Sequence, residues 1–286
     1  MNDTLKRLVH AGSRSYGRLT AAHRMLPAFL ICGGQRCGTT SLYRALAQHP
    51  AVIKAVLHKG VHYFDVSYHR GPAWYRAHFP LHRTARRRSQ ALAGAPVQTF
   101  ESSPYYLYHP LAGPRLAADL PDVKLLVLIR DPVERAYSHH AHEVARGFES
   151  EVDFGRALAL EPQRLAGQTA RLAADPAAYS FAHQHHAYRA RGEYVRYLRR
   201  LSDSVARDRI HVLDSAEFFA RPARAYADVL DFLGLPHLGD PVFEQHNARP
   251  RPAPLDPGLR RELATHYEPF DARLAAWLGY EPAWRR

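Results

Sequence analysis

The stretch that decides the fold is Gly33-Gly34-Gln35-Arg36-Cys37-Gly38-Thr39-Thr40-Ser41, which lies between an apolar run and an amphipathic segment. The run at residues 28–32, Ala-Phe-Leu-Ile-Cys, predicts a buried strand of a parallel sheet. Residues 39–48 have the apolar spacing of a helix and end before a His-Pro pair. A glycine-rich turn in this setting predicts a phosphate-binding loop, because backbone N–H groups and the helix N-terminus face the anion.

The loop has the G-x4-G frame of a P-loop, but Thr39 stands where that frame has lysine, and the cation is Arg36 inside the loop. We expect the anion to be bound by this arginine together with the residues that follow it, which are Cys37, Gly38, Thr39, Thr40 and Ser41. A P-loop kinase would need the missing lysine and a carboxylate for Mg²⁺. Asp131 is a candidate for that carboxylate, so an ATP-dependent kinase stays an alternative.

The remaining pattern alternates strands with helices. Strands are predicted at residues 51–55, 97–100, 124–129 and 209–213, and helices at 132–146, 188–201, 218–233 and 258–278, with an Ala-rich helical insert at 148–182. Such alternation predicts an α/β fold: a single domain with a central parallel sheet, helices on both faces and a P-loop-like nucleotide site. We expect this domain to cover residues 27–286, after a basic N-terminal arm at residues 1–26.

Composition narrows the function classes. The 286 residues carry 39 Lys+Arg and 27 Asp+Glu, a formal charge of +12, which suggests an anionic partner. No nucleic-acid recognition motif accompanies the charge, so nucleic-acid binding is not expected; the cluster of Arg83 and Arg86–Arg88 is interpreted as a solvated loop. Two cysteines five residues apart exclude a disulfide framework and favour a reducing, cytoplasmic setting. The amphipathic N-terminal arm leaves peripheral membrane contact open.

Two further motifs give the loop a family context. They are Lys59-Gly60-Val61-His62-Tyr63-Phe64-Asp65 and Arg130-Asp131-Pro132-Val133-Glu134-Arg135-Ala136-Tyr137-Ser138. Together with the loop they resemble motifs of sulfotransferases that use 3′-phosphoadenosine 5′-phosphosulfate (PAPS), in particular the heparan-sulfate-type and related bacterial enzymes. Shorter strings at 74–80, 101–105 and 191–194 fall in the same order, so the resemblance covers residues 27–284.

The resemblance implies transfer of a sulfuryl group from PAPS, in line and without a metal, to a hydroxyl or amine, with 3′-phosphoadenosine 5′-phosphate (PAP) as product. The acceptor would be a carbohydrate, glycolipid or small molecule. Arg36 occupies the position of the family's loop lysine, while Arg130 and Ser138 would bind the 3′-phosphate. A late loop closes over the nucleotide in this family, so Arg249 or Arg251 would clamp the same phosphate.

The sequence departs from the family pattern at the catalytic base. The family's acceptor motif begins Lys-Glu, and this chain has Gly60 in place of that glutamate. His62 is the first candidate for a substitute base because imidazole titrates near neutral pH, and we expect it to share a face with position 60 in extended chain. Glu101 is the second candidate, and Asp65 is expected to orient the histidine or the acceptor. A catalytically impaired PAPS-binding protein is the alternative.

Two histidine groups, at 139–142 and 183–186, have some of the spacing of helical zinc ligands. No acidic or cysteine residue is spaced to complete either group, so no metal site is predicted. Acceptor choice is expected to depend on residues 66–96 and 148–187, while the sequence leaves the acceptor and the oligomeric state open.

Overall fold

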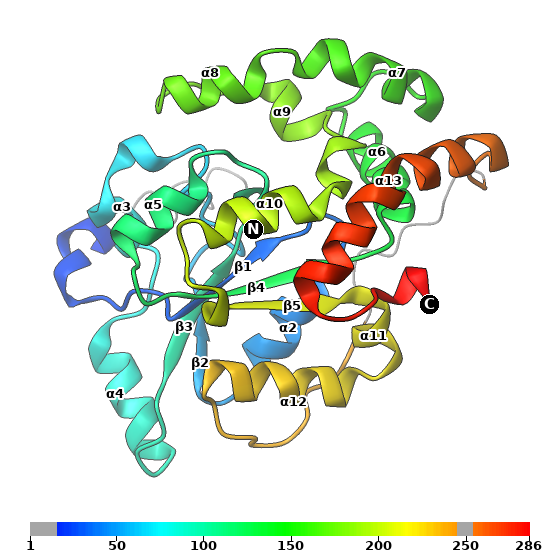
Figure 1. Ribbon diagram of the computed structural model, residues 1–286. Helices are drawn as coiled ribbons and strands as arrows, with labels where there is room; N and C mark the ends of the chain where they lie inside the picture. Colours follow the sequence, from blue (N-terminus) through cyan, green and yellow to red (C-terminus); the bar gives the residue numbers. More distant parts are fainter. Residues whose placement is uncertain (1–15, 245–253) are drawn as a thin grey trace.

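The computed structural model describes residues 16–244 and 254–286 (Figure 1). In this part of the chain five parallel strands form one sheet in the order β2-β3-β1-β4-β5. The strands are β1 (Phe29–Gly33), β2 (Val52–Lys54), β3 (Gln98–Ser102), β4 (Lys124–Ile129) and β5 (Ile210–Asp214). The predicted fold class is confirmed, and each strand lies within two residues of its predicted bounds.

The two central strands explain why the sheet forms here. Every residue of β1 is buried, as are the last five residues of β4, which matches their uninterrupted apolar sequences. Phe29 of β1 stacks on Phe100 of β3 with ring centroids 4.8 Å apart. Burying side chains of this size contributes about 1.5–3 kcal/mol each, so the apolar runs are the main source of stability for the sheet.

Helices cover both faces of the sheet (Figure 1). In the figure, α2 and α12 lie on one face, and α6, α10 and α13 lie on the other. The helices are α2 (Thr39–Gln48), α3 (Pro72–Arg76), α4 (His82–Ala91), α5 (Ala112–Asp119), α6 (Pro132–Ala145), α7 (Phe154–Leu165), α8 (Gln168–Ala174), α9 (Phe181–His185), α10 (Tyr194–Ser202), α11 (Ser215–Ala220), α12 (Pro222–Leu233) and α13 (Pro257–Leu278). The predicted helical insert therefore consists of α7, α8 and α9.

Some predicted elements differ from the structure. The helix predicted at 218–233 is two helices, because Arg221 precedes a proline and adopts φ −136° and ψ 63° instead of helical backbone. The helix predicted from residue 188 begins only at Tyr194. The cluster of Arg83 and Arg86–Arg88 was predicted as a loop, but it forms part of α4, where its side chains are exposed.

The N-terminal arm and the late loop are described only in part. Residues 1–15 of the N-terminal arm, together with Arg249 and Arg251 of the late loop, lie outside the described residues. The described end of the arm packs on the domain: Arg24 donates a hydrogen bond to Phe79 O at 2.6 Å, and Met25 N donates to Pro80 O at 2.9 Å. Within residues 16–244 and 254–286, the helices are too short or too polar to cross a membrane.

Candidate active site

The glycine loop, residues 33–41, leaves β1 at the carboxyl edge of the sheet and leads into α2. Gly34 N donates a hydrogen bond to Leu128 O of β4, which ties the loop to the neighbouring strand. Gly38 has φ +88°, and a Cβ there would lie 3.1 Å from the ring of Phe219. A left-handed backbone and this close ring both require glycine. The loop is therefore held in a fixed shape, with the N-terminus of α2 at its end.

A cavity of about 320 Å³ opens beside the loop. Its lining comprises Gln35, Arg36, Thr39, Thr40, Lys59, Gly60, His62, Ser102, Pro104, Tyr105, His142, Arg146, Gln184, His185 and Arg191. These described lining residues include four cationic side chains and three histidines, but no carboxylate. Because cations and a helix N-terminus converge on the same space, the cavity attracts anions.

Lys59 is a cation of this cavity that the sequence predictions left without a role. Its Nζ donates to Thr40 Oγ1 at 2.9 Å and lies 3.3 Å from Thr39 Oγ1, so it joins the first turn of α2 to the segment that follows β2. Burial lowers the pKa of Lys59 to about 8, partly opposed by the charge of Glu101. The sequence did offer one indication of a role for Lys59, since this residue is the first of the Lys59–Asp65 motif.

Gly60 and His62 share one space in the cavity. A Cβ at Gly60 would lie 2.6 Å from Ser102 O and 3.4 Å from His62 Nε2. The imidazole therefore lies beside the point where a side chain at position 60 would begin. The expectation of extended chain here was wrong, since His62 has φ 54° and lies directly before a turn at residues 63–66. The left-handed backbone at His62, rather than strand alternation, accounts for the position of the ring beside residue 60.

Asp65 contacts this histidine, which is one of the two roles expected for it. His62 Nδ1 lies 2.7 Å from Asp65 Oδ2, and the carboxylate is buried while 39% of the His62 side chain is exposed. Burial lowers the pKa of His62, but the charge of Asp65 and its hydrogen bond outweigh that effect, so the pKa is raised above its ordinary value. Because Nδ1 faces the carboxylate, Nε2 is the ring atom left for a ligand in the cavity.

Glu101 occupies a different environment. It is fully buried, and its carboxylate accepts hydrogen bonds from Tyr106 Oη at 2.7 Å, Ser103 Oγ at 2.7 Å and Val61 N at 3.1 Å. Burial raises the pKa of Glu101, although the Ser103 and Tyr106 hydrogen bonds oppose this. With both oxygens engaged inside the protein, this carboxylate anchors the chain segment that carries His62.

The Arg130–Ser138 motif meets the glycine loop. Arg36 Nε donates to Ser138 Oγ at 3.1 Å, which brings two of the predicted binding residues from different motifs into contact. Arg130 follows β4 and pairs with Glu134 at 3.7 Å, with a third of its side chain exposed. Asp131 caps α6, because its side chain accepts hydrogen bonds from Val133 N and Glu134 N.

The remaining loop residues contribute mainly backbone. Cys37 is fully buried, with Sγ 3.5 Å from Tyr194 Oη, and burial raises the pKa of its thiol. Ser41 is also buried. Gln35, Glu143 and Arg191 were not among the predicted site residues, although Gln35 lies in the glycine loop and Arg191 begins the string at 191–194. Their side chains form a partly buried network beside the loop, in which Gln35 and Arg191 also line the cavity.

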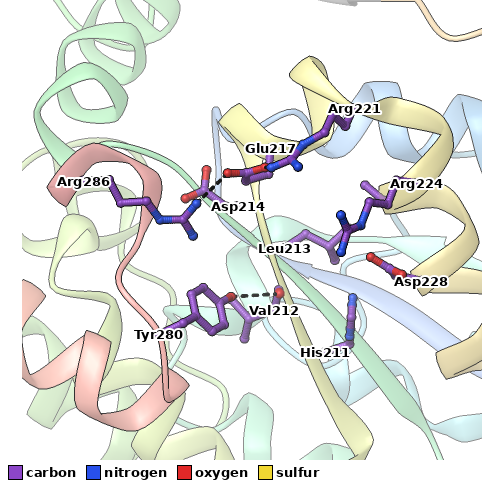
Figure 2. A pocket seen from close by; sticks show the side chains of 11 residues that line it. His211, Val212, Leu213, Asp214, Glu217, Arg221, Arg224, Asp228, Tyr280 and Arg286 are labelled. Atoms are coloured by element: carbon purple, nitrogen blue, oxygen red, sulfur yellow. Dashed lines mark hydrogen bonds and ion pairs between the residues drawn. The ribbon is translucent and has the colours of Figure 1, made fainter.

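A second hollow of about 440 Å³ lies beside β5, between α11, α12 and the C-terminal segment (Figure 2). In this hollow Glu217 pairs with both Arg221 and Arg286. Ser215 and Phe219 of α11 lie against Gly38 of the glycine loop, whereas Glu217 and Arg221 line the hollow. The charges in Figure 2 largely neutralise one another, so the cavity beside the glycine loop is the stronger candidate for an anion site.

The glycine loop lies at the carboxyl edge of a parallel sheet, where it contacts a second strand–helix motif and borders a cationic cavity. These features are typical of P-loop-like domains, which bind anionic ligands at this edge. Residues 26–247 match the family model of the sulfotransferase domain, and the chain belongs to that family.

Individual relatives agree with this. The chain is 30% identical over 290 residues to human heparan sulfate glucosamine 3-O-sulfotransferase 6, a match covering 91% of this chain and 74% of the relative. It is 36% identical over 115 residues to the membrane-associated sulfotransferase kil1 of Dictyostelium discoideum, covering 40% of this chain and 22% of that longer protein. A solved sulfotransferase from Alicyclobacillus acidocaldarius has a TM-score of 0.68 at 28% identity, covering 92% of this chain and all of that one.

The packing at Gly60 leads to a stability prediction. Gly60→Glu introduces the glutamate that the family has at this position. It should lower the free energy of unfolding by about 1–3 kcal/mol, because its Cβ meets the Ser102 carbonyl. Urea unfolding of the wild type and the variant measures this. Gly155→Ala in α7 is the control, since its Cβ would meet the end of the Asp153 side chain and make an ordinary contact with Leu259. This variant should be as stable as wild type or slightly more so. Equal stability of Gly60→Glu and wild type would contradict the prediction.

Proposed function

We propose that this protein transfers a sulfuryl group from PAPS to a hydroxyl, or less favourably an amine, of an acceptor and releases PAP. The contact that carries the proposal is the Arg36 Nε–Ser138 Oγ hydrogen bond, because it joins the loop suited to a 5′-phosphosulfate to the motif suited to a 3′-phosphate. A carboxylate-free lining supports a polyanionic donor. Family membership supports the reaction class.

Sulfuryl transfer requires three events at the site. The acceptor oxygen forms a bond to sulfur while the bond from sulfur to the phosphate oxygen breaks, and the acceptor proton must leave. The glycine loop, with Arg36 and Lys59, would hold the donor and stabilise the negative charge on the departing phosphate. His62 Nε2 would take the proton, and the Asp65 carboxylate would stabilise the imidazolium that forms. We propose that the reaction proceeds by direct in-line transfer without a metal.

We propose His62 as the base in preference to Glu101. The imidazole lines the cavity and lies beside the position of the family glutamate, whereas Glu101 is buried and accepts hydrogen bonds from four donors. This arrangement supports an active enzyme over an impaired PAPS-binding protein. Asp131 is engaged as the cap of α6, which weighs against a kinase that would use it for Mg²⁺.

The acceptor is proposed only as a class. One human relative is named as a heparan sulfate glucosamine 3-O-sulfotransferase, which supports a carbohydrate or glycolipid hydroxyl, with small molecules as a further class. The cytoplasmic setting and peripheral membrane contact of the N-terminal arm stay proposals, and residues 1–15 of that arm lie outside the described residues.

Ligand-dependent thermal unfolding tests the donor. PAP at 100 times its dissociation constant should stabilise the protein by about 2.7 kcal/mol, which raises the Tm by several degrees. AMP should stabilise it less, since AMP lacks the 3′-phosphate. Stabilisation by ATP·Mg²⁺ in the absence of any PAP effect would favour a kinase and overturn the proposal.

Arg130 provides a sharper test of the 3′-phosphate site. Arg130→Ala should weaken PAP binding about tenfold or more while changing AMP binding little, because a charge-assisted hydrogen bond to phosphate contributes roughly 1.5–3 kcal/mol. Isothermal titration with both nucleotides measures the difference. Arg164→Ala, which removes an ion pair on the helical insert instead, is the matched control. Equal losses for PAP and AMP would show that Arg130 does not read the 3′-phosphate.

The His62–Asp65 pair predicts a pH dependence. Activity should rise with pH as the His62 imidazolium loses its proton, and fall again above pH about 8 as Lys59 loses its charge. Since Asp65 raises the pKa of His62, Asp65→Asn should shift the rising limb of the pH–activity profile to lower pH.

Removal of the imidazole is the second test of the base. His62→Ala should lower kcat by about 10²–10⁴ with little change in PAP affinity. His69→Ala, an exposed histidine on the next turn, should behave as wild type. An unshifted limb in Asp65→Asn would argue against His62 as the base.

A further inference from the structure

A carboxylate in α6 contacts groups on both sides of the cavity. The Glu143 side chain is completely buried, and Oε1 accepts a hydrogen bond from Gln35 Nε2 of the glycine loop at 3.0 Å. Oε2 lies 3.0 Å from His185 Nδ1 of α9, and His139 Nε2 lies 3.4 Å from Oε1. One carboxylate thus receives a donor from the glycine loop and another from the last helix of the insert.

The charges around Glu143 keep it ionised. Burial alone would raise its pKa, but the interactions with the nearby His139 and His185 rings hold the pKa well below its usual range. His139, beside it on α6, has its pKa lowered by burial and by the charges of Arg191 and Arg135, so this imidazole is neutral at pH 7. A buried carboxylate with satisfied donors is rigid, because losing one donor leaves a charge without its partner.

The loop side of this network fixes an amide in one orientation. The Gln35 carbonyl accepts a hydrogen bond from Arg191 Nη1, and its amide nitrogen donates to Glu143. Arg191 is anchored in turn, since Nη2 donates to Gln184 O at 2.6 Å and the guanidinium lies 4.9 Å from the Tyr105 ring centroid. Gln35 is therefore held between an anion and a cation, directly before Arg36.

The insert side presents a histidine to the cavity. His185 lines the cavity wall, and its ring packs at 4.7 Å from Phe148 and 4.6 Å from Phe181, measured between centroids. Because Nδ1 faces Glu143, Nε2 is the atom that remains for a ligand. Through α9 the insert thus contributes Gln184 and His185 to the wall of the cavity.

We propose that Glu143 is a positioning residue that couples the cavity wall formed by α9 to the glycine loop through His185 and Gln35. His185 and Gln35 interact through this shared carboxylate, so a change in the hydrogen bonding of one alters the orientation of the other. Donor affinity then depends on what His185 contacts, and the dependence is reciprocal. This inference rests on the proposed function, because it takes the glycine loop as the PAP site.

A double-mutant cycle measured with PAP tests the coupling without any acceptor. Gln35→Ala and His185→Ala should each weaken PAP binding, by about tenfold and about three- to tenfold, and the double variant should bind much as Gln35→Ala does. Glu143→Gln should weaken PAP binding at least as much as Gln35→Ala. Titration calorimetry gives the dissociation constants, and urea unfolding confirms that the variants are folded; the Gln35/His185 cycle decides the question even when Glu143→Gln does not fold.

The neighbouring histidine is the matched control. His186 Nε2 lies 2.8 Å from Phe148 O, on the same segment but away from Glu143, so His186→Ala should leave PAP affinity unchanged. PAP binding by His185→Ala equal to wild type, or effects of Gln35→Ala and His185→Ala that multiply, would overturn the coupling and leave the proposed function standing. A wild-type protein that does not bind PAP would overturn both.

Discussion

The parallel pairing of β1 with β4 is the constraint on which the site depends. Register from Phe29 with Lys124 to Gly33 with Val127 brings the ends of both strands to one edge of the sheet. The glycine loop leaves β1 there, and Arg130 follows β4 at the same edge, so two motifs about a hundred residues apart in sequence meet in one hydrogen bond between Arg36 and Ser138. Only strands that run in the same direction place both loops on one edge.

Most of the fold is predictable because its signals are local. Apolar runs such as residues 124–129 mark buried strands, and the glycine loop marks the turn between strand and helix. The break at Arg221 is also local, since it precedes a proline, but the apolar spacing on either side concealed it. The position of His62 is different: its own positive φ decides where the ring lies, and no periodic pattern in the sequence predicts that angle.

The motif residues of the site could be predicted from the sequence, whereas the residues that hold them in place were harder to predict. Arg36, His62 and Ser138 lie in recognisable strings, whereas Glu143 lies outside them and contacts a residue more than a hundred positions away in the chain. Glu101 shows that residue type alone can also mislead. Its carboxylate suits a base, but burial and four hydrogen bonds make it an anchor for the segment of His62. The residue type shows which reactions a side chain is able to perform, but its burial and hydrogen bonds decide which role it has.

The amide of Gln35 also restricts how this loop evolves. Its nitrogen faces Glu143 and its oxygen faces Arg191, so an acid at position 35 would pair with Arg191 but repel Glu143, while a lysine would pair with Glu143 but repel Arg191. The neutral amide satisfies both partners at once, because it carries a donor and an acceptor. A change of charge at position 35 therefore exchanges one contact for the other unless Glu143 or Arg191, which are remote in the chain, changes with it. A library designed to retune the loop would gain more by varying position 35 together with 143 and 191 than by varying it alone.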